Sequence, residues 1–214
     1  MSDDYLGPER GHRFFEFART RPDAYTWMDR SLSEYAHMYR ESADLLMTKA
    51  CDAPGLLNAH AIPAVYLFRH FVELSLKDLL ISAGRLAEKG GSFPDGHRSE
   101  PLWMKLRALL QEANLAESAE DRATLDVVDE MIRELDSVDG RSMAFRYPVG
   151  TSQKDGGREL LLCDDFEYFD MRIFRDQAER LANFVGGCDS QIQAYLDIEG
   201  ELDREYQDHL SDEW

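Results

Sequence analysis

Apolar residues recur at helical spacing along most of the chain, and this pattern predicts a protein made largely of α-helices. Short connections and few strand signals indicate a single all-α domain, an antiparallel up-and-down bundle of four to five helices. An N-terminal arm is expected at residues 1–21 and an acidic extension at residues 196–214. The expected helices cover residues 22–49, the stretch from a break at 53–55 to about 89, and residues 100–114, 118–139 and 166–210.

Local signals mark where several of these helices begin and end. The Pro-Gly pair at 54–55 ends the first helix. Ser118 and Asp121 have the spacing of a capping box, which predicts the start of the fourth helix. The Gly-Gly pair at 186–187 is expected to interrupt the last helix.

Residues 141–165 do not follow a helical pattern and are expected to hold a small β-hairpin. The tetrapeptide FRYP at 145–148 is turn-like or extended. Residues 159–163 have strand character and are expected to pair with residues 144–149. Cys163 would then be a buried strand residue.

The segment Ala64–Ile81 is apolar on nearly every face but carries a stripe of charged residues. At 100° per residue, Arg69, Glu73 and Lys77 fall within about 80° of one another, with His70 just beyond. A helix that is apolar nearly all round lies at the centre of a protein, where charges are costly unless they are paired or used. The stripe can partly neutralise itself at i,i+4 spacing, and it marks the place to look for a site.

Two interpretations of this stripe remain open. In the first, Glu73 is a buried carboxylate that pairs with Lys77, Arg69 or Arg146 and so pins the FRYP turn onto the core helix. In the second, the groups surround a small anionic ligand such as a nucleotide, with Arg contacting phosphate and Tyr147 stacking on the base. The candidate ligand-binding residues are charged or aromatic: Arg69, His70, Glu73, Lys77, His97, Arg146 and Tyr147.

Composition narrows the class of protein. The net charge of -18 opposes non-specific contact with nucleic-acid phosphates or anionic membranes. An acidic N-terminus and the lack of an apolar span predict neither a signal peptide nor a membrane helix, so the protein is expected to be cytoplasmic.

Three cysteines without CxxC spacing are expected to be reduced thiols, and no metal or cofactor is expected. Residues 117–139 hold nine acids and are expected to form a solvated acidic face.

Several of these segments together resemble a known family. The sequence RHFVELSLKDLL at 69–80, the Gly-His pair at 96–97, FRYP at 145–148 and a long last helix are similar to bacterial HEPN-like proteins. HEPN stands for "higher eukaryotes and prokaryotes nucleotide-binding". The resemblance covers roughly residues 60–195, and it implies an up-and-down helical bundle that forms homodimers.

Many HEPN proteins are metal-independent ribonucleases of toxin–antitoxin and phage-defence systems, with an Arg-x(4–6)-His motif. The resemblance implies that the His handles protons at the 2′-hydroxyl or leaving oxygen while the Arg stabilises the phosphorane charge. Two segments match the motif, Arg30…His37 and Arg204…His209. Acidic residues surround the second pair and would repel RNA.

Three functions are consistent with these observations. The leading hypothesis is a non-catalytic HEPN-like protein of bacterial defence or stress that dimerises and binds a partner protein or a small anionic or nucleotide ligand. The alternative is a HEPN endoribonuclease that acts on RNA as a dimer, with Arg204 and His209 as weak catalytic candidates. The third is the substrate-binding half of a nucleotidyltransferase. The expected partner is an antitoxin or a nucleotidyltransferase.

A homodimer is also indicated by the residues themselves. The flanking segments carry more aromatic side chains than they can bury alone, which is typical of an interface. These residues are Phe14, Phe15, Phe17, Phe166, Tyr168 and Phe169.

Overall fold

A computed structural model describes residues 31–115, 118–139, 143–147, 149–151, 158–160 and 168–212. Within these residues, five α-helices pack against one another, which confirms the predicted all-α bundle. They are α1 (Leu32–Asp52), α2 (Leu57–Leu86), α3 (Ser99–Glu112), α4 (Ala119–Val138) and α5 (Met171–Asp212). A short 3-10 helix, η2 (Pro54–Leu56), joins α1 to α2. No helix of the described part is long and apolar enough to cross a membrane.

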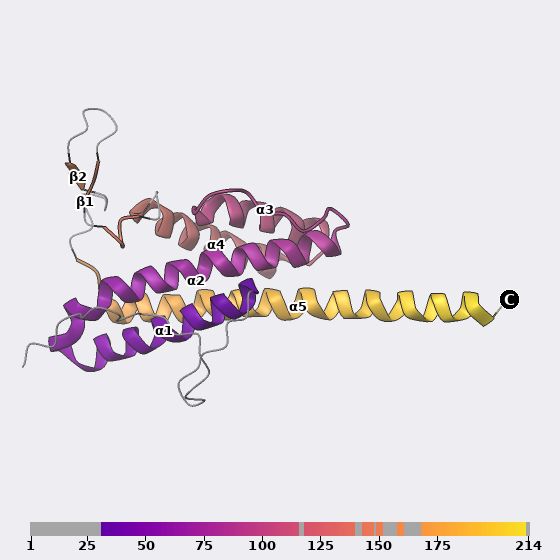
Figure 1. The fold of residues 1–214 in the computed structure, drawn as a ribbon, viewed down its shortest axis with the longest axis horizontal. Helices are drawn as coiled ribbons and strands as arrows, with labels where there is room; N and C mark the ends of the chain where they lie inside the picture. Colours follow the sequence, from indigo (N-terminus) through magenta and orange to yellow (C-terminus); the bar gives the residue numbers. More distant parts are fainter. Residues whose placement is uncertain are drawn as a thin grey trace, which may run out of the picture.

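Helix α2 is the centre of the bundle, as its sequence predicts. It packs against α1, α3 and α5, while α4 packs on α3 (Figure 1). Because α2 has neighbours on several sides, its buried side chains lie around most of its circumference. They include Phe68, Val72, Leu76 and Leu80, and also the charged residues Arg69 and Glu73.

The helix boundaries follow the capping signals. Ser31 caps α1 by accepting a hydrogen bond from the Glu34 backbone N–H at 3.1 Å. The predicted start of this helix at residue 22 lies outside the described residues. Ser118 and Asp121 form the predicted capping box at the start of α4.

The last helix differs from the prediction, because α5 continues through the Gly-Gly pair at 186–187. The neighbouring residues Val185 and Cys188 are buried against the core and hold the backbone in helical geometry. The packed stripe continues to Ile192 and Leu196, and beyond it α5 extends past the other helices (Figure 1). Packing therefore overrides the low helix propensity of glycine.

The described part of the irregular region contains a short antiparallel hairpin whose register differs from the prediction. Strand β1 (Val149–Thr151) pairs with β2 (Arg158–Leu160), with Gly150 opposite Glu159. Residues 143–147 do not join this sheet. They form a turn in which the backbone N–H groups of Arg146 and Tyr147 donate to the Met143 carbonyl at 3.0 and 2.9 Å. Cys163 lies outside the described residues.

The continuity of α5 predicts that Gly187→Ala stabilises the protein. A Cβ atom at this position would point into open space, and alanine favours a helix interior over glycine by about 0.5–1 kcal/mol. Chemical denaturation should show a higher free energy of unfolding by about this amount.

Gly84→Ala is the matched contrast, because a Cβ atom on that α2 glycine would overlap the backbone carbonyl of Gly90. This variant should be destabilised by about 1–3 kcal/mol. A destabilised Gly187→Ala variant would instead indicate that α5 is interrupted at the glycine pair.

Candidate functional site

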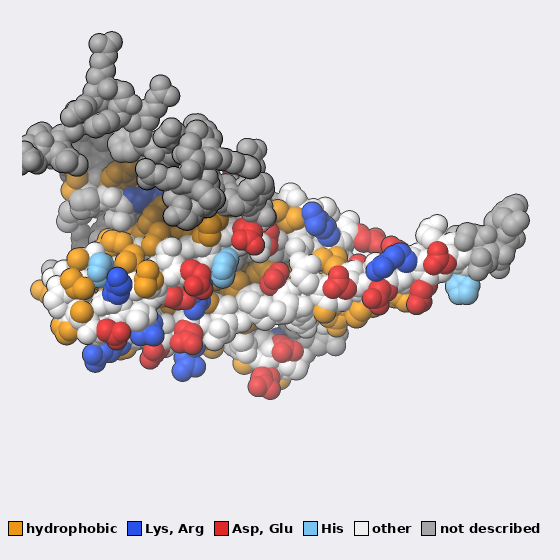
Figure 2. All heavy atoms as spheres, turned by 60° about the horizontal axis from the view of Figure 1, so that its bottom comes forward, with side chains coloured by type: hydrophobic (Ala, Val, Ile, Leu, Met, Phe, Trp, Pro, Cys, Tyr) orange, Lys and Arg blue, Asp and Glu red, His pale blue; other side chains and the backbone are white. Residues whose placement is uncertain are grey.

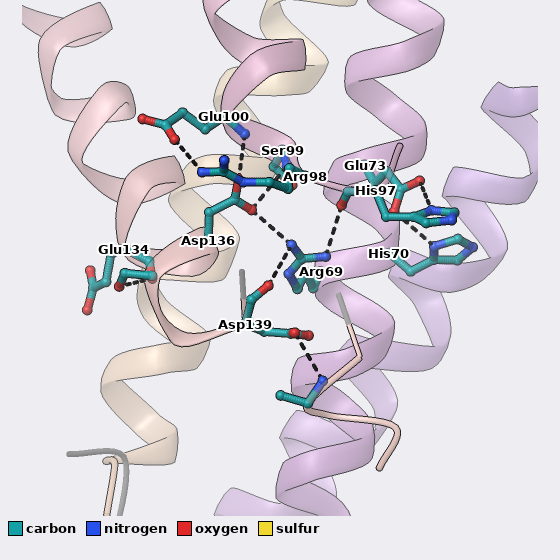
Figure 3. A network of polar contacts seen from close by, with 12 residues as sticks. Arg69, His70, Glu73, His97, Arg98, Ser99, Glu100, Glu134, Asp136 and Asp139 are labelled. Atoms are coloured by element: carbon teal, nitrogen blue, oxygen red, sulfur yellow. Dashed lines mark hydrogen bonds and ion pairs between the residues drawn. The ribbon is translucent and has the colours of Figure 1, made fainter. Parts of the chain in front are cut away.

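The side chain of Arg69 joins three segments of the chain in the interior. Its guanidinium donates to the Asp136 carboxylate at 2.9 Å, to the Asp139 carbonyl at 3.2 Å and to the His97 carbonyl at 3.3 Å (Figure 3). Both members of the Arg69–Asp136 pair are buried. The planar guanidinium suits this role because it donates in several fixed directions at once. Arg69 therefore holds α2, the end of α4 and the turn before α3 together.

The two aspartates complete this network through backbone contacts. The Asp136 carboxylate accepts from the N–H groups of Ser99 and Glu100 at 3.1 and 2.9 Å, so a residue of α4 caps the N-terminus of α3. The Asp139 carboxylate accepts from the N–H groups of Met143 and Ala144 and closes the turn at residues 143–147, which includes the first three residues of the FRYP segment. The prediction that residues 117–139 form a solvated acidic face is wrong for Asp136 and Asp139, which are buried. They continue the apolar face of α4 at helical spacing.

Glu73 is the centre of a second group of contacts on the same face of α2. Its carboxylate accepts from the Lys77 ammonium at 2.6 Å and lies 3.0 Å from Nδ1 of His97 and 3.8 Å from Nδ1 of His70. Only 2% of Glu73 is exposed. The prediction that Glu73 is buried and paired is confirmed. Its cationic partner is Lys77, whereas Arg69 pairs with Asp136.

The pairing of Glu73 determines its charge. Burial raises the pKa of the carboxyl group, but hydrogen bonds from His70, Lys77 and His97 and the charge of Lys77 outweigh it and lower the pKa from 4.5 to about 2. Glu73 is therefore ionised at neutral pH and can only accept hydrogen bonds. It follows that Nδ1 of His97 is the donor in the 3.0 Å contact with Glu73.

Aromatic rings fix the position of His70 beside Glu73. The His70 ring stacks on Tyr66 with a centroid distance of 6.2 Å and an interplanar angle of 7°. It is nearly perpendicular to the Tyr39 ring, with the two centroids 4.4 Å apart. On the Tyr66 ring lies the Arg146 guanidinium, with Cζ 5.2 Å from the centroid. These contacts, rather than a bond to Glu73, bring the FRYP turn to the core helix.

A small cavity of about 10 Å³ lies between these two groups. Its lining residues are Tyr66, Arg69, His70, Glu73, Asp139 and Arg146. Among the described residues, the Nε atom of Arg69 is buried without a hydrogen-bond partner. A buried guanidinium donor of this kind favours a water molecule or an anion next to it.

The structure brings most of the candidate ligand-binding residues together. Arg69, His70, Glu73 and Arg146 line the cavity, and Lys77 and His97 join them through Glu73. Tyr147 is 53% exposed and is not one of the cavity residues.

Sequence reasoning missed Tyr66 and the two aspartates. Tyr66 lies four residues before His70, on the charged face of α2, so helical spacing was the signal for it. For Asp136 the signal was its spacing from Leu125, Val128 and Ile132 on the apolar face of α4.

The described residues of the two Arg-x(4–6)-His matches lie on α5 and α1. Arg204 and His209 are exposed on the part of α5 that extends beyond the bundle, and Nε of Arg204 donates to the Gly200 carbonyl at 2.8 Å. His37 is exposed on α1, and Arg30 lies outside the described residues. Of these four residues, the described ones, His37, Arg204 and His209, do not belong to the Glu73 group.

Comparison of the chain with protein-family models, curated proteins and solved structures gives no match. Within the described residues, no group of three or more His, Cys, Asp or Glu side chains is arranged to hold a metal ion. The function of the site has to follow from the chemistry of its own side chains.

The burial of Glu73 predicts that Glu73→Gln destabilises the protein. A carboxyl group whose pKa falls from 4.5 to about 2 on folding contributes about 3 kcal/mol at neutral pH. Because the pKa is lowered, this contribution is complete above pH 4.5 and is lost as the pH falls through about 2. Urea denaturation at several pH values should show the difference from wild type shrinking below pH 4.5.

Glu112→Gln is the control, because Glu112 forms an exposed ion pair with Lys89. Exposed pairs contribute little, so its free energy of unfolding should change by less than about 1 kcal/mol. Equal effects of the two substitutions would contradict a special role for Glu73.

Proposed function

We propose that this protein binds a small phosphate-bearing anion, such as a nucleotide, over the cavity formed by α2 and the FRYP turn. The observation that carries the proposal is the proximity of an unpaired buried Arg69 donor to two accessible hydrogen-bonding side chains, Arg146 and His97. The His97 side chain is 62% exposed, and Arg146 is exposed as well. Guanidinium and imidazolium groups are the side chains that recognise phosphate most effectively.

The charge around the cavity supports this choice of ligand. Arg69, Lys77 and Arg146 balance three carboxylates there, Glu73, Asp136 and Asp139. The charges of this group are therefore balanced, although the whole chain has a net charge of -18. A balanced site on an acidic protein selects for a ligand that makes close, directional contacts over one attracted by long-range charge.

The size of the cavity limits how the anion binds. A cavity of about 10 Å³ has room for about one water molecule, so a phosphate group would lie at its mouth and not inside. Arg146 and His97 would contact it from the solvent side. An attached base would lie near Tyr147, which is accessible for stacking.

The resemblance to HEPN-like proteins agrees with a nucleotide ligand on an up-and-down bundle. Under this proposal, the protein forms homodimers and acts with a partner protein, such as an antitoxin or a nucleotidyltransferase, in bacterial defence or stress. Of the aromatic residues expected at the dimer interface, Tyr168 is strongly exposed.

A second candidate function, cleavage of RNA, is favoured by one observation. Two imidazoles, those of His70 and His97, face the same ionised carboxylate through Nδ1. A carboxylate that orients a histidine in this way is common in general acid–base catalysis. Cleavage of an RNA oligonucleotide without added metal, abolished by His97→Ala, would support this candidate over simple binding.

The proposal predicts that phosphate and adenosine monophosphate stabilise the protein against thermal unfolding. A ligand at ten times its Kd stabilises the native state by about 1.4 kcal/mol. Arg146→Ala should abolish this gain and leave the melting temperature without ligand close to that of wild type. Differential scanning fluorimetry at millimolar ligand concentrations measures both quantities.

Arg122→Ala is the matched control, because Arg122 is exposed on α4 and is not a cavity residue. This variant should retain the full stabilisation by ligand. The absence of any stabilisation in wild type, or an equal gain in Arg146→Ala, would rule out the proposed site.

A further inference from the structure

The C-terminal part of α5 extends beyond the side chains that pack into the core of the described bundle. The last α5 side chain that packs against the core is Leu196, and no described side chain after it is buried. The helix nevertheless continues to Asp212, well beyond the rest of the bundle (Figure 1). A solitary helix of this length is only marginally stable in water, so a partner that covers one face would stabilise it.

One face of this projecting helix is apolar. Tyr195, Ile198, Leu202 and Tyr206 are each 45–64% exposed and fall within about 80° of one another at 100° per residue. We call these four residues the 195–206 stripe. It is about 17 Å long, which matches about three turns of a second helix packed alongside. A continuous apolar stripe on an exposed helix is typical of a helix–helix interface.

Acidic residues lie on both sides of the stripe. At 100° per residue, Glu199 and Asp203 lie along one edge, and Glu201 and Glu205 lie along the other. Several red acidic side chains are visible on the projecting helix in Figure 2. Flanking positions of this kind determine which partner a helix accepts.

The charges argue against a second copy of the same helix as the occupant. In either a parallel or an antiparallel pair, the acidic flanks of one copy would face those of the other. Arg204 is the single Lys or Arg between residues 195 and 212, so it cannot compensate for them. Like charges across an interface disfavour pairing.

We infer that the 195–206 stripe docks an amphipathic helix of a partner protein that carries apolar residues at heptad spacing with Lys or Arg on both flanks. The apolar residues of the partner cover the stripe, and its cations pair with the acidic edges. This inference does not depend on the anion site, because the stripe lies on a different part of the molecule.

A synthetic peptide of about three heptads, with Leu at the core positions and Lys at the flanking ones, tests this inference. Its binding to the full chain is measured by fluorescence anisotropy, beside the same peptide with Glu in place of each Lys. The Lys peptide should bind at least about tenfold more tightly than the Glu peptide. The double variant Ile198→Ser/Leu202→Ser should weaken binding of the Lys peptide at least about tenfold.

Val127→Ser is the control, because Val127 is an exposed apolar residue of α4 outside the stripe. It should bind the Lys peptide as tightly as wild type. The melting temperatures of both variants should equal that of wild type, which separates lost docking from lost folding.

Equal binding of the two peptides, or unchanged binding by the double variant, overturns the inference. A wild-type dimer that the double variant converts to monomer would identify a second copy as the occupant and also overturn it.

Discussion

The ion pair between Arg69 and Asp136 determines where three parts of the chain meet. Both side chains are buried, and each is the buried countercharge of the other; the half-exposed Arg98 adds a longer contact, with Nε 3.5 Å from the Asp136 carboxylate. The same arginine holds the carbonyls of His97 and Asp139, and the same aspartate caps α3. Because these bonds share two side chains, the turn before α3 and the end of α4 are fixed relative to α2. The candidate site lies where these segments converge.

Glu73 forms the accessible side of this arrangement. It remains ionised because Lys77 and His97 hydrogen-bond to it, and it holds His97 where solvent can reach the ring. A buried carboxylate thus positions an imidazole on the surface of an acidic protein. The stacked Tyr66 and Arg146 close the other side of the small cavity. The site is assembled mainly from α2, with the loops contributing its accessible cations.

The sequence indicated the parts of this structure that depend on local spacing. The Glu73–Lys77 pair has i,i+4 spacing on one helix, and the capping box at Ser118 lies within four residues, so both were predicted. The partner of Arg69 was not, because Asp136 is 67 residues away and only the packing of α4 brings it near. Packing also kept α5 helical through its glycine pair. The hairpin register was misjudged because Asp139 takes the backbone of residues 143 and 144 into a turn.

A double-mutant cycle on Arg69→Met and Asp136→Asn tests the central claim most directly. Asparagine keeps only one of the two oxygens that accept from the α3 backbone, but this loss is common to the Asp136→Asn and double variants, so the coupling energy of the cycle reports the pairing with Arg69. Urea denaturation gives the free energy of unfolding for wild type, both single variants and the double variant. The structure predicts that each single substitution costs about 3–5 kcal/mol, because it leaves a buried charge uncompensated, and that the double variant costs at least about 2 kcal/mol less than their sum. Additive costs within about 0.5 kcal/mol would show that Arg69 and Asp136 do not depend on each other, and would contradict this account.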